Sequence, residues 1–140
     1  RQGPAGVLLT RVLYVKTQGT RRFVVVDAAM TELLRPALYE AYHAIAPVEF
    51  PSSTLEVRTS PCDVVGPVCE SGDFLALERP LPEVQAGDLL AVYGAGAYGR
   101  EMSMTYNARV PAAEVLVDGA LMKVVRERPP VESLWAHEHW

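Results

Sequence analysis

The chain has 140 residues, a formal net charge of −4, 49% hydrophobic residues and 21% charged residues. This length suits a single domain with one hydrophobic core, and the composition is ordinary for a globular protein. The basic residues are scattered and no aromatic run interleaves with them, so the sequence does not favour nucleic acid as a partner. No apolar stretch is long enough to cross a bilayer and no signal peptide is visible, so we expect no membrane partner.

The two cysteines, Cys62 and Cys69, are not spaced as a C-x-x-C pair. Two cysteines in a chain of this length do not make a disulfide scaffold. We therefore expect free thiols and a cytoplasmic location, with a disulfide between the two as the alternative. His137 and His139 would complete a four-ligand zinc set with these cysteines only at an unconvincing spacing, so the sequence predicts no metal site.

The first part of the chain reads mainly as strands. Apolar and β-branched residues over 6–17 and 21–29 predict two strands joined by a tight hairpin turn. Residues 31–43 have the best helical pattern, but Pro36 lies inside it. We expect Pro36 to end or kink this helix near Leu34, which leaves a short or broken helix.

The second part continues the pattern of short strands separated by turns. Further strands are predicted at residues 55–59, 73–82 and 89–93. Residues 112–128 form the clearest hairpin, and the dipeptide Asp118-Gly119 suits a type I′ turn. The tail predicts one helical turn that docks Trp135. About eight strands with one or two short helices predict one all-β domain over residues 1–140, a Greek-key-like sandwich or barrel.

A turn between two predicted strands carries the string Cys69-Glu70-Ser71-Gly72-Asp73. A neighbouring carboxylate raises the pKa of a thiol, so this pair does not make an activated nucleophile. One interpretation is structural, with Ser71 and Asp73 bonding backbone amides and Cys69 acting as a small buried hydrophobe. The functional interpretation is a proton donor beside a group that holds an ammonium.

Two further patterns allow both a structural and a functional interpretation. The glycines of "GAGAYG", residues 94–99, permit a sharp turn, or they present Tyr98 to a ligand. Arg35 and Tyr39 are four residues apart, which places them on one face of a helix. They form either a solvated surface pair or a site for a carboxylate or phosphate.

The strings "CDVVGPVCESGDFLA", "RPALYEAYH", "GAYG…MS…YN.R" and "AEVLVDG" together resemble the C-terminal domain of the diaminopimelate decarboxylase family. The resemblance covers the chain from about Gly6 to the "ESLW" near its end. The family belongs to the pyridoxal-phosphate (PLP) enzymes of the alanine-racemase-like fold type, which combine an α/β barrel with a β-domain. The resemblance implies that this chain is the β-domain and that the barrel lies outside it.

Five residues match positions of the family to which a role is assigned. The resemblance implies that Cys69 donates a proton to the substrate carbon after CO2 leaves, and that Glu70 binds the distal amino group. It implies that Arg35 and Tyr39 bind substrate near its distal carboxylate, and that Tyr98 lies at the cofactor and substrate. The guanidinium fork of Arg35 and the orientable hydroxyl of Tyr98 suit these roles.

The resemblance also implies a cofactor and partners. PLP is the expected cofactor, and the lysine that binds it belongs to the missing barrel, because Lys16 and Lys123 do not sit in the family's lysine motif. The expected partners are the chain's own barrel domain and a second subunit of a homodimer, into whose barrel the Cys-Glu element reaches.

The implied reaction converts meso-2,6-diaminopimelate to L-lysine and CO2 in lysine biosynthesis, and the isolated domain is expected to be inactive. One alternative is a decarboxylase domain of the same fold that acts on ornithine, arginine or carboxynorspermidine. The other alternative is a non-catalytic β-barrel assembly module.

Overall fold

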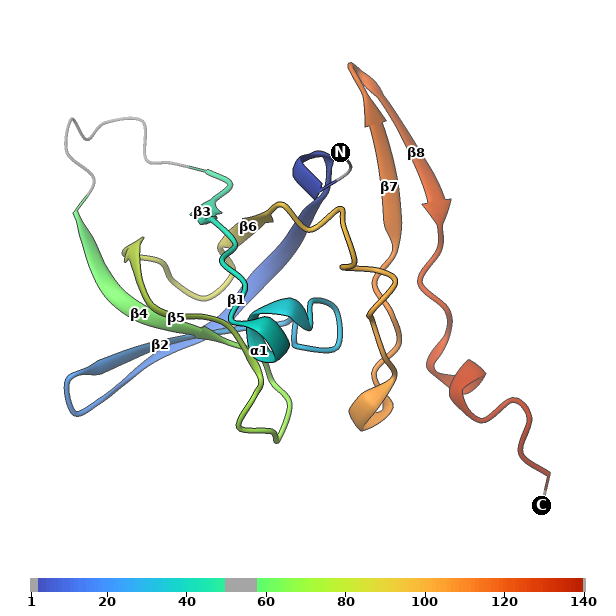
Figure 1. Ribbon diagram of the computed structural model, residues 1–140, viewed down its shortest axis with the longest axis horizontal. Coiled ribbons are helices and arrows are strands. Elements are labelled where there is room, and N and C mark those ends of the chain that lie inside the picture. Colours follow the sequence, from blue (N-terminus) through green and yellow to red (C-terminus); the bar gives the residue numbers. More distant parts are fainter. Residues whose placement is uncertain (1–2, 50–57, 140) are drawn as a thin grey trace.

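The computed structural model describes residues 3–49 and 58–139 (Figure 1). In these residues the strands, in chain order, are β1 (Val7–Gln18), β2 (Arg21–Val26), β3 (Ile45–Pro47), β4 (Thr59–Val65), β5 (Phe74–Pro82), β6 (Leu89–Tyr93), β7 (Glu114–Asp118) and β8 (Leu121–Arg126). The α-helix is α1 (Arg35–Tyr39), and short 3-10 turns cover Gly3–Ala5, Tyr106–Ala108 and Val131–Leu134. In the part of the chain so described, no helix is long and apolar enough to span a membrane.

Strands β1 to β6 form one curved sheet in the order β3-β6-β1-β2-β4-β5. All neighbours are antiparallel except β2 and β4, which run parallel. The two end strands, β3 and β5, contact each other, so the sheet is a nearly closed barrel. Strands β7 and β8 form a separate two-stranded sheet beside it. The prediction of an all-β, barrel-like domain with about eight strands is confirmed.

The barrel has one hydrophobic core that draws on nearly every strand of the large sheet. Its fully or almost fully buried side chains include Val12, Val24, Val26, Leu33, Val64, Leu75, Leu81, Leu90 and Val92. Full burial of each of these side chains is worth roughly 1.5–3 kcal/mol relative to leaving it in water. This core holds the strand ends in place, and the loops at those ends carry the candidate site.

Helix α1 is short, as predicted, but Pro36 lies at the start of the helix, whereas we expected it to end or kink the helix. Pro36 lies in the first turn, and Leu34 is the N-cap residue, so the expected end or kink near Leu34 is wrong. A proline in the first helical turn blocks no internal hydrogen bond, and its φ is already helical. The helix ends at Glu40, which has a left-handed φ of 54° and donates its N–H to the carbonyl oxygen of Arg35.

Both predicted hairpins are confirmed, and the turn type of the second differs from the prediction. Gly119 and Ala120 form a two-residue loop between the paired residues Asp118 and Leu121. Gly119 has a φ of 59°, whereas Ala120 has no positive φ. A type I′ turn needs a positive φ at both positions, so the geometry is that of type II′, which takes glycine first. Gly19 has the same role in the β1–β2 hairpin, with a φ of 60°.

Three smaller expectations have mixed outcomes. The predicted strand over 55–59 falls mostly outside the described residues, and β4 begins at Thr59. Strand β5 continues through Pro80 to Pro82, which is tolerated because β5 is an end strand of the sheet. The helical turn in the tail is present at Val131–Leu134, but Trp135 is 42% exposed, so its expected docking is wrong.

Candidate functional site

The turn between β4 and β5 is anchored by one buried carboxylate, which accepts hydrogen bonds from backbone N–H groups. Asp73, only 4% exposed, accepts hydrogen bonds from the N–H groups of Val68 and Met30, each at 2.7 Å. Gly66 lies against the same carboxylate, and a Cβ there would collide with it. The structural interpretation of Asp73 as an anchor of backbone amides is therefore confirmed. Its two bonds fix residues 66–73 against the segment that leads into α1.

The anchored turn presents Cys69 and Glu70 to solvent, and both side chains are exposed. The interpretation of Cys69 as a buried hydrophobe is therefore wrong. The Glu70 carboxylate accepts a bond of 3.3 Å from the N–H of Gly72 within the turn. An exposed thiol and an exposed carboxylate on a rigid turn are free to meet a group that comes from outside.

Cys62 has the opposite environment to Cys69. Its thiol is buried in β4 and donates to the carbonyl oxygen of Arg79 at 3.4 Å, and burial raises its pKa. The two cysteines are both free, so the alternative of a disulfide is wrong. Only Cys69 is accessible to a substrate. Among the described residues no cluster of histidine, cysteine or carboxylate side chains could hold a metal ion.

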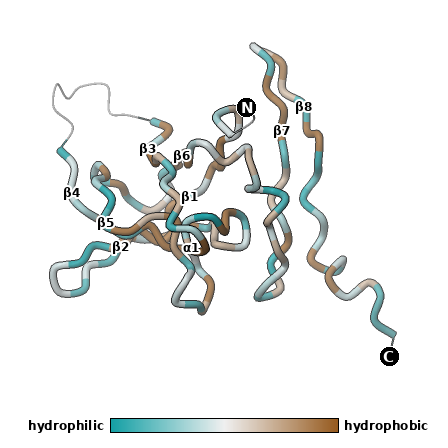
Figure 2. The backbone as a smooth tube through the Cα atoms, in the orientation of Figure 1, coloured by the Kyte–Doolittle hydropathy of each residue, from teal (hydrophilic) through white to brown (hydrophobic). Residues whose placement is uncertain are grey.

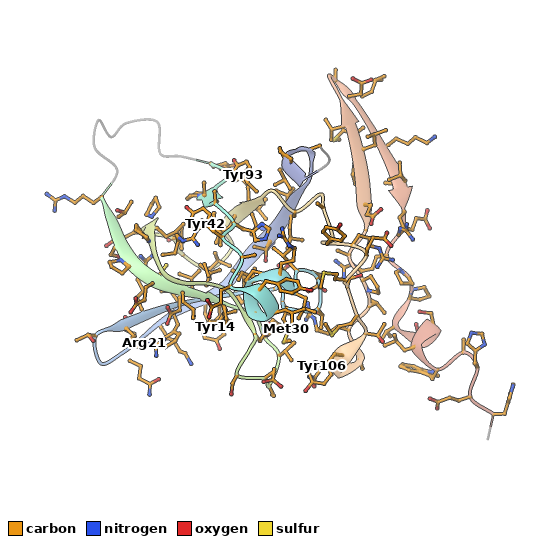
Figure 3. The ribbon with its side chains drawn as sticks, viewed as in Figure 1. Tyr14, Arg21, Met30, Tyr42, Tyr93 and Tyr106 are labelled. Atoms are coloured by element: carbon orange, nitrogen blue, oxygen red, sulfur yellow. The ribbon has the colours of Figure 1, made fainter. Side chains whose placement is uncertain are left out.

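Helix α1 packs beside the Cys69 turn. A Cβ placed on Gly72 would lie 3.9 Å from the Cβ of Ala37 and 3.9 Å from the Cε of Met30. Figure 3 shows Met30 next to α1, and Figure 1 shows the β4–β5 turn beside the same helix. The fold therefore brings the helix that carries Arg35 and Tyr39 next to the turn that carries Cys69 and Glu70.

Arg35 and Tyr39 stand one helical turn apart on α1, as predicted. Arg35 is partly buried and Tyr39 is mostly exposed. Within the described ranges, no carboxylate lies at ion-pair distance from Arg35. Its guanidinium fork is therefore available to a carboxylate that is not part of this domain.

Tyr98 lies in a different loop, which follows β6. It is 65% exposed and has a left-handed φ of 62°, which is unusual for a residue with a bulky side chain. A Cβ on Gly99 would collide with the carbonyl oxygen of Ala95 in the same loop. It would lie 3.7 Å from the Cδ1 of Leu33, so the loop lies beside the segment before α1. The strained backbone and the exposed ring favour the interpretation that this loop presents Tyr98.

Arg109 connects the segment after the Tyr98 loop to the segment before α1, and the sequence did not reveal this role. Its guanidinium donates to the hydroxyl of Thr31 at 3.0 Å and to the carbonyl oxygen of Asp27 at 2.7 Å. It also forms an ion pair of 3.2 Å with the carboxylate of Glu32, which is nearly buried. A nearly buried carboxylate such as that of Glu32 needs a charged or hydrogen-bonding partner. This need is the one signal in the sequence that could have pointed to a distant arginine such as Arg109.

A cavity of about 830 Å³ lies between the Tyr98 loop, the start of β1 and the start of β7. Its lining residues include Tyr98, Arg100, Glu32, Val7 and Val115. Of the five predicted site residues only Tyr98 lines this cavity. The other four do not line it: Tyr39, Cys69 and Glu70 are exposed, and Arg35 is partly buried on α1.

The chain matches, over residues 4–96, the model of the family described as "Pyridoxal-dependent decarboxylase, C-terminal sheet domain". This match covers well over half of the chain, and the chain belongs to that family. The resemblance stated from the sequence is confirmed. A β-domain that exposes the thiol of Cys69 and the carboxylate of Glu70 is consistent with this membership.

Several relatives match almost the whole chain. A diaminopimelate decarboxylase of Aquifex aeolicus is 52% identical over 126 residues, which are 90% of this chain and 29% of the relative. One of Neisseria meningitidis serogroup B is 50% identical over 136 residues, 97% of this chain and 32% of the relative. This chain therefore spans less than a third of the length of these relatives.

Solved structures agree with this result. The crystal structure of diaminopimelate decarboxylase from Helicobacter pylori complexed with L-lysine matches with a TM-score of 0.86 and 43% identity, over 95% of this chain and 32% of that one. An arginine decarboxylase of Paramecium bursaria Chlorella virus matches with a TM-score of 0.69 at only 16% identity, over 76% of this chain and 28% of that one. The second likeness shows the fold alone.

Proposed function

We propose that residues 1–140 are the C-terminal β-domain of a diaminopimelate decarboxylase, which converts meso-2,6-diaminopimelate to L-lysine and CO2. The observation that carries this proposal is the exposed Cys69–Glu70 turn beside Arg35, which has no ion-pair partner among the described residues, in a chain about half identical to enzymes of that name. A substrate with an ammonium and a carboxylate at its distal end would satisfy both Glu70 and Arg35.

The residues of this chain can hold part of a PLP site but not all of it. Tyr98 offers an exposed hydroxyl at the cavity, and Cys69 offers an exposed thiol. The two lysines, Lys16 on β1 and Lys123 on β8, are both exposed, and neither lines the cavity. The lysine that binds PLP therefore belongs, on this proposal, to the barrel domain outside the chain.

When bound, PLP would supply an electron sink for the electron pair that loss of CO2 leaves on the substrate carbon. The thiol of Cys69 then delivers its proton to that carbon, and the rigid turn sets the direction from which the proton comes. The carboxylate of Glu70 holds the distal ammonium, and the guanidinium of Arg35 and the hydroxyl of Tyr39 hold the distal carboxylate. Tyr98 holds the cofactor and substrate from the other loop.

The exposed Cys69 turn also supports a two-subunit site. Cys69, Glu70, Arg35 and Tyr39 lie outside the domain's cavity, so another body must cover them to exclude water. We assign Cys69 and Glu70 to a site in the α/β barrel of a second subunit of a homodimer, and we expect the α/β barrel domain of the same polypeptide to be a further partner of this domain. We also propose a cytoplasmic location, supported by two unpaired cysteines, one of them exposed.

Arg35 separates this proposal from the same-fold alternatives. Ornithine and arginine have no distal carboxylate, so an enzyme for either of them has no use for an unpaired arginine at this position. A non-catalytic assembly module would use neither the thiol nor the arginine.

The test uses the full-length protein that contains this chain. We expect turnover of meso-2,6-diaminopimelate with release of CO2, and little turnover of ornithine or arginine. Arg35→Ala should lower kcat/KM for diaminopimelate by about 10- to 100-fold, because it removes charge-assisted hydrogen bonds worth about 1.5–3 kcal/mol. Arg11→Ala, an exposed arginine on β1, is the control and should leave turnover near wild type. Equal losses in both variants, or preferred turnover of ornithine, would contradict the proposal.

A further inference from the structure

Three elements that carry predicted site residues are attached to one short stretch of chain, residues 27–34, which we call the pre-α1 segment. This segment carries none of the five predicted site residues itself. It continues directly into α1, which carries two of them. The N–H of Met30 donates to the carboxylate of Asp73 at 2.7 Å, so the same segment also holds the Cys69 turn. The third element is the Tyr98 loop, which the fold brings to the pre-α1 segment after β6 (Figure 1).

The Tyr98 loop is attached on both sides of Tyr98. Before it, the N–H of Ala95 donates to the carbonyl oxygen of Gly6 at 2.9 Å. After it, the N–H of Met104 donates to the carbonyl oxygen of Thr31 at 3.0 Å. The position of Tyr98 relative to α1 and the Cys69 turn therefore depends on how the loop meets the pre-α1 segment.

Thr31, Glu32 and Arg109 form a connected polar cluster behind this attachment. Thr31 is 1% exposed and the side chain of Glu32 is 6% exposed. The hydroxyl of Thr31 accepts a hydrogen bond from the Nε of Arg109 at 3.0 Å and donates one to the carboxylate of Glu32 at 3.0 Å. Arg109 also pairs with Glu32 at 3.2 Å and donates to the carbonyl oxygen of Asp27 at 2.7 Å. One guanidinium therefore contacts the pre-α1 segment at three residues.

The polar character of this cluster is not what the stability of the fold requires. Desolvation of two buried charges offsets their attraction, so apolar side chains of similar size often hold two segments together equally well. Apolar residues are abundant here, since Figure 2 shows both teal and brown along the pre-α1 segment. Directional hydrogen bonds add one defined relative position. That position matters in a site assembled from separate loops, where a misplacement of about 1 Å costs about 100-fold in rate.

We propose that Thr31, Glu32 and Arg109 are positioning residues of the decarboxylase, whose bonds set where Tyr98 stands relative to α1 and the Cys69 turn. They act through Tyr98 rather than on the substrate. This inference rests on the proposed function, in which Tyr98 holds the cofactor and substrate. It extends that function to three residues to which the resemblance assigns no role.

Arg109→Lys in the full-length enzyme is the first test. The lysine keeps a positive charge opposite Glu32 and loses the planar fork that reaches Thr31 and Asp27. We expect kcat per bound PLP to fall about tenfold, because the Tyr98 loop is misplaced. A purely structural role would lower the amount of folded, PLP-loaded enzyme and leave kcat per bound PLP near wild type. That second result would overturn the proposal.

Arg21→Lys is the matched control. Arg21 also pairs with a nearly buried carboxylate, that of Asp63, but on strands that carry no predicted site residue. Its kcat per bound PLP should stay near wild type, and a loss equal to that of Arg109→Lys would overturn the proposal. Thr31 provides a second test if Arg109→Lys does not fold. Thr31→Val removes the hydroxyl and should lower kcat per bound PLP, whereas Thr31→Ser keeps the hydroxyl and should restore it; equal values in the two variants would contradict the positioning role.

A double-mutant cycle tests whether Arg109 acts through Tyr98. Tyr98→Phe removes the hydroxyl that is positioned, so in that background Arg109→Lys should lower kcat per bound PLP by less than about twofold. Losses that multiply would mean that the two residues act independently, and they would overturn the proposal. Full turnover in Tyr98→Phe alone would overturn it as well.

Hydrogen exchange separates this inference from the proposed function, because it is measured without substrate. The amides of residues 95–105 should exchange about tenfold faster in Arg109→Lys than in wild type, and at the wild-type rate in Arg21→Lys. Unchanged exchange in Arg109→Lys, in an enzyme that decarboxylates diaminopimelate normally, refutes only this inference. Faster exchange in that variant, in a protein whose wild type does not decarboxylate diaminopimelate, refutes only the proposed function.

Discussion

Strand β4 and the turn that follows it use the same kinds of side chain in opposite ways. On β4 the thiol of Cys62 is buried, and the buried Asp63 is paired with Arg21 and with the N–H of Glu78. Seven residues after Cys62, the thiol of Cys69 is exposed beside a carboxylate that has no ion-pair partner among the described residues. The polar groups of the strand are paired within this domain, whereas the thiol and the carboxylate of the turn face solvent. Residues that hold the fold are therefore separable from residues that serve the chemistry.

The largest expected effect comes from the two cysteines. In the full-length enzyme, Cys69→Ala should lower kcat by about 10²- to 10⁴-fold, the usual range for removal of a general acid. Its melting temperature and its PLP absorbance should stay near those of wild type, because the side chain is exposed. Cys62→Ala is the matched control and should lower stability while kcat stays near wild type. If both variants lost kcat, or both lost stability, the residues that hold the fold would not be separable from those that serve the chemistry.

Asp73→Asn should affect both properties, because Asp73 is the buried anchor of the exposed turn. The amide keeps one acceptor oxygen for two N–H donors, so stability should fall by about 1–3 kcal/mol. Turnover should also fall, since Cys69 and Glu70 lose their fixed position. Asp118→Asn, at the exposed end of β7, is the control, and it should change stability by less than about 0.5 kcal/mol. Thermal melts with steady-state kinetics measure both effects, and an unchanged melting temperature for Asp73→Asn would refute its anchoring role.

A smaller effect is expected from the buried thiol at high pH. Burial raises the pKa of Cys62 above its ordinary value of 9.0, so the folded state keeps the proton after the unfolded state has begun to lose it. The contribution to stability is complete below pH 9.0 and is lost as the pH rises through the higher pKa of the folded state. The free energy of unfolding should fall by at most about 1.4 kcal/mol per pH unit in that window. Cys62→Ala should flatten this dependence, and an unchanged slope in that variant would exclude the thiol as its cause.

Local patterns predicted the barrel well and its internal contacts poorly. The alternation in β1, with Thr10 and Val12 buried between exposed neighbours, and the glycines at the hairpin turns are local signals. Pro36 was placed wrongly because the same residue that breaks the interior of a helix is favoured in its first turn. The parallel pairing of β2 with β4 depends on segments far apart in sequence, and no local period indicates it.

In the candidate site, too, the sequence indicated some features and not others. Cys69, Glu70, Arg35, Tyr39 and Tyr98 could be proposed as site residues from the resemblance to the family, because each matches one of its positions by residue type alone, and their roles stay predictions. The contacts that hold those residues in place could not be named, since Asp73 reaches Met30 and Arg109 reaches Thr31 across 43 and 78 positions of sequence. Such pairings depend on the completed fold rather than on local spacing.

The central claim is that Cys69 and Glu70 act in the site of a partner subunit. Mixing tests it most directly: full-length Cys69→Ala subunits are combined with subunits in which the PLP-binding lysine of the barrel is replaced by alanine. Each variant alone is expected to be inactive. Random reassociation of the two should restore about a quarter of wild-type activity, because half of the dimers are mixed and each mixed dimer has one intact site. No recovery in the mixture, with mixed dimers verified by mass, would contradict the account.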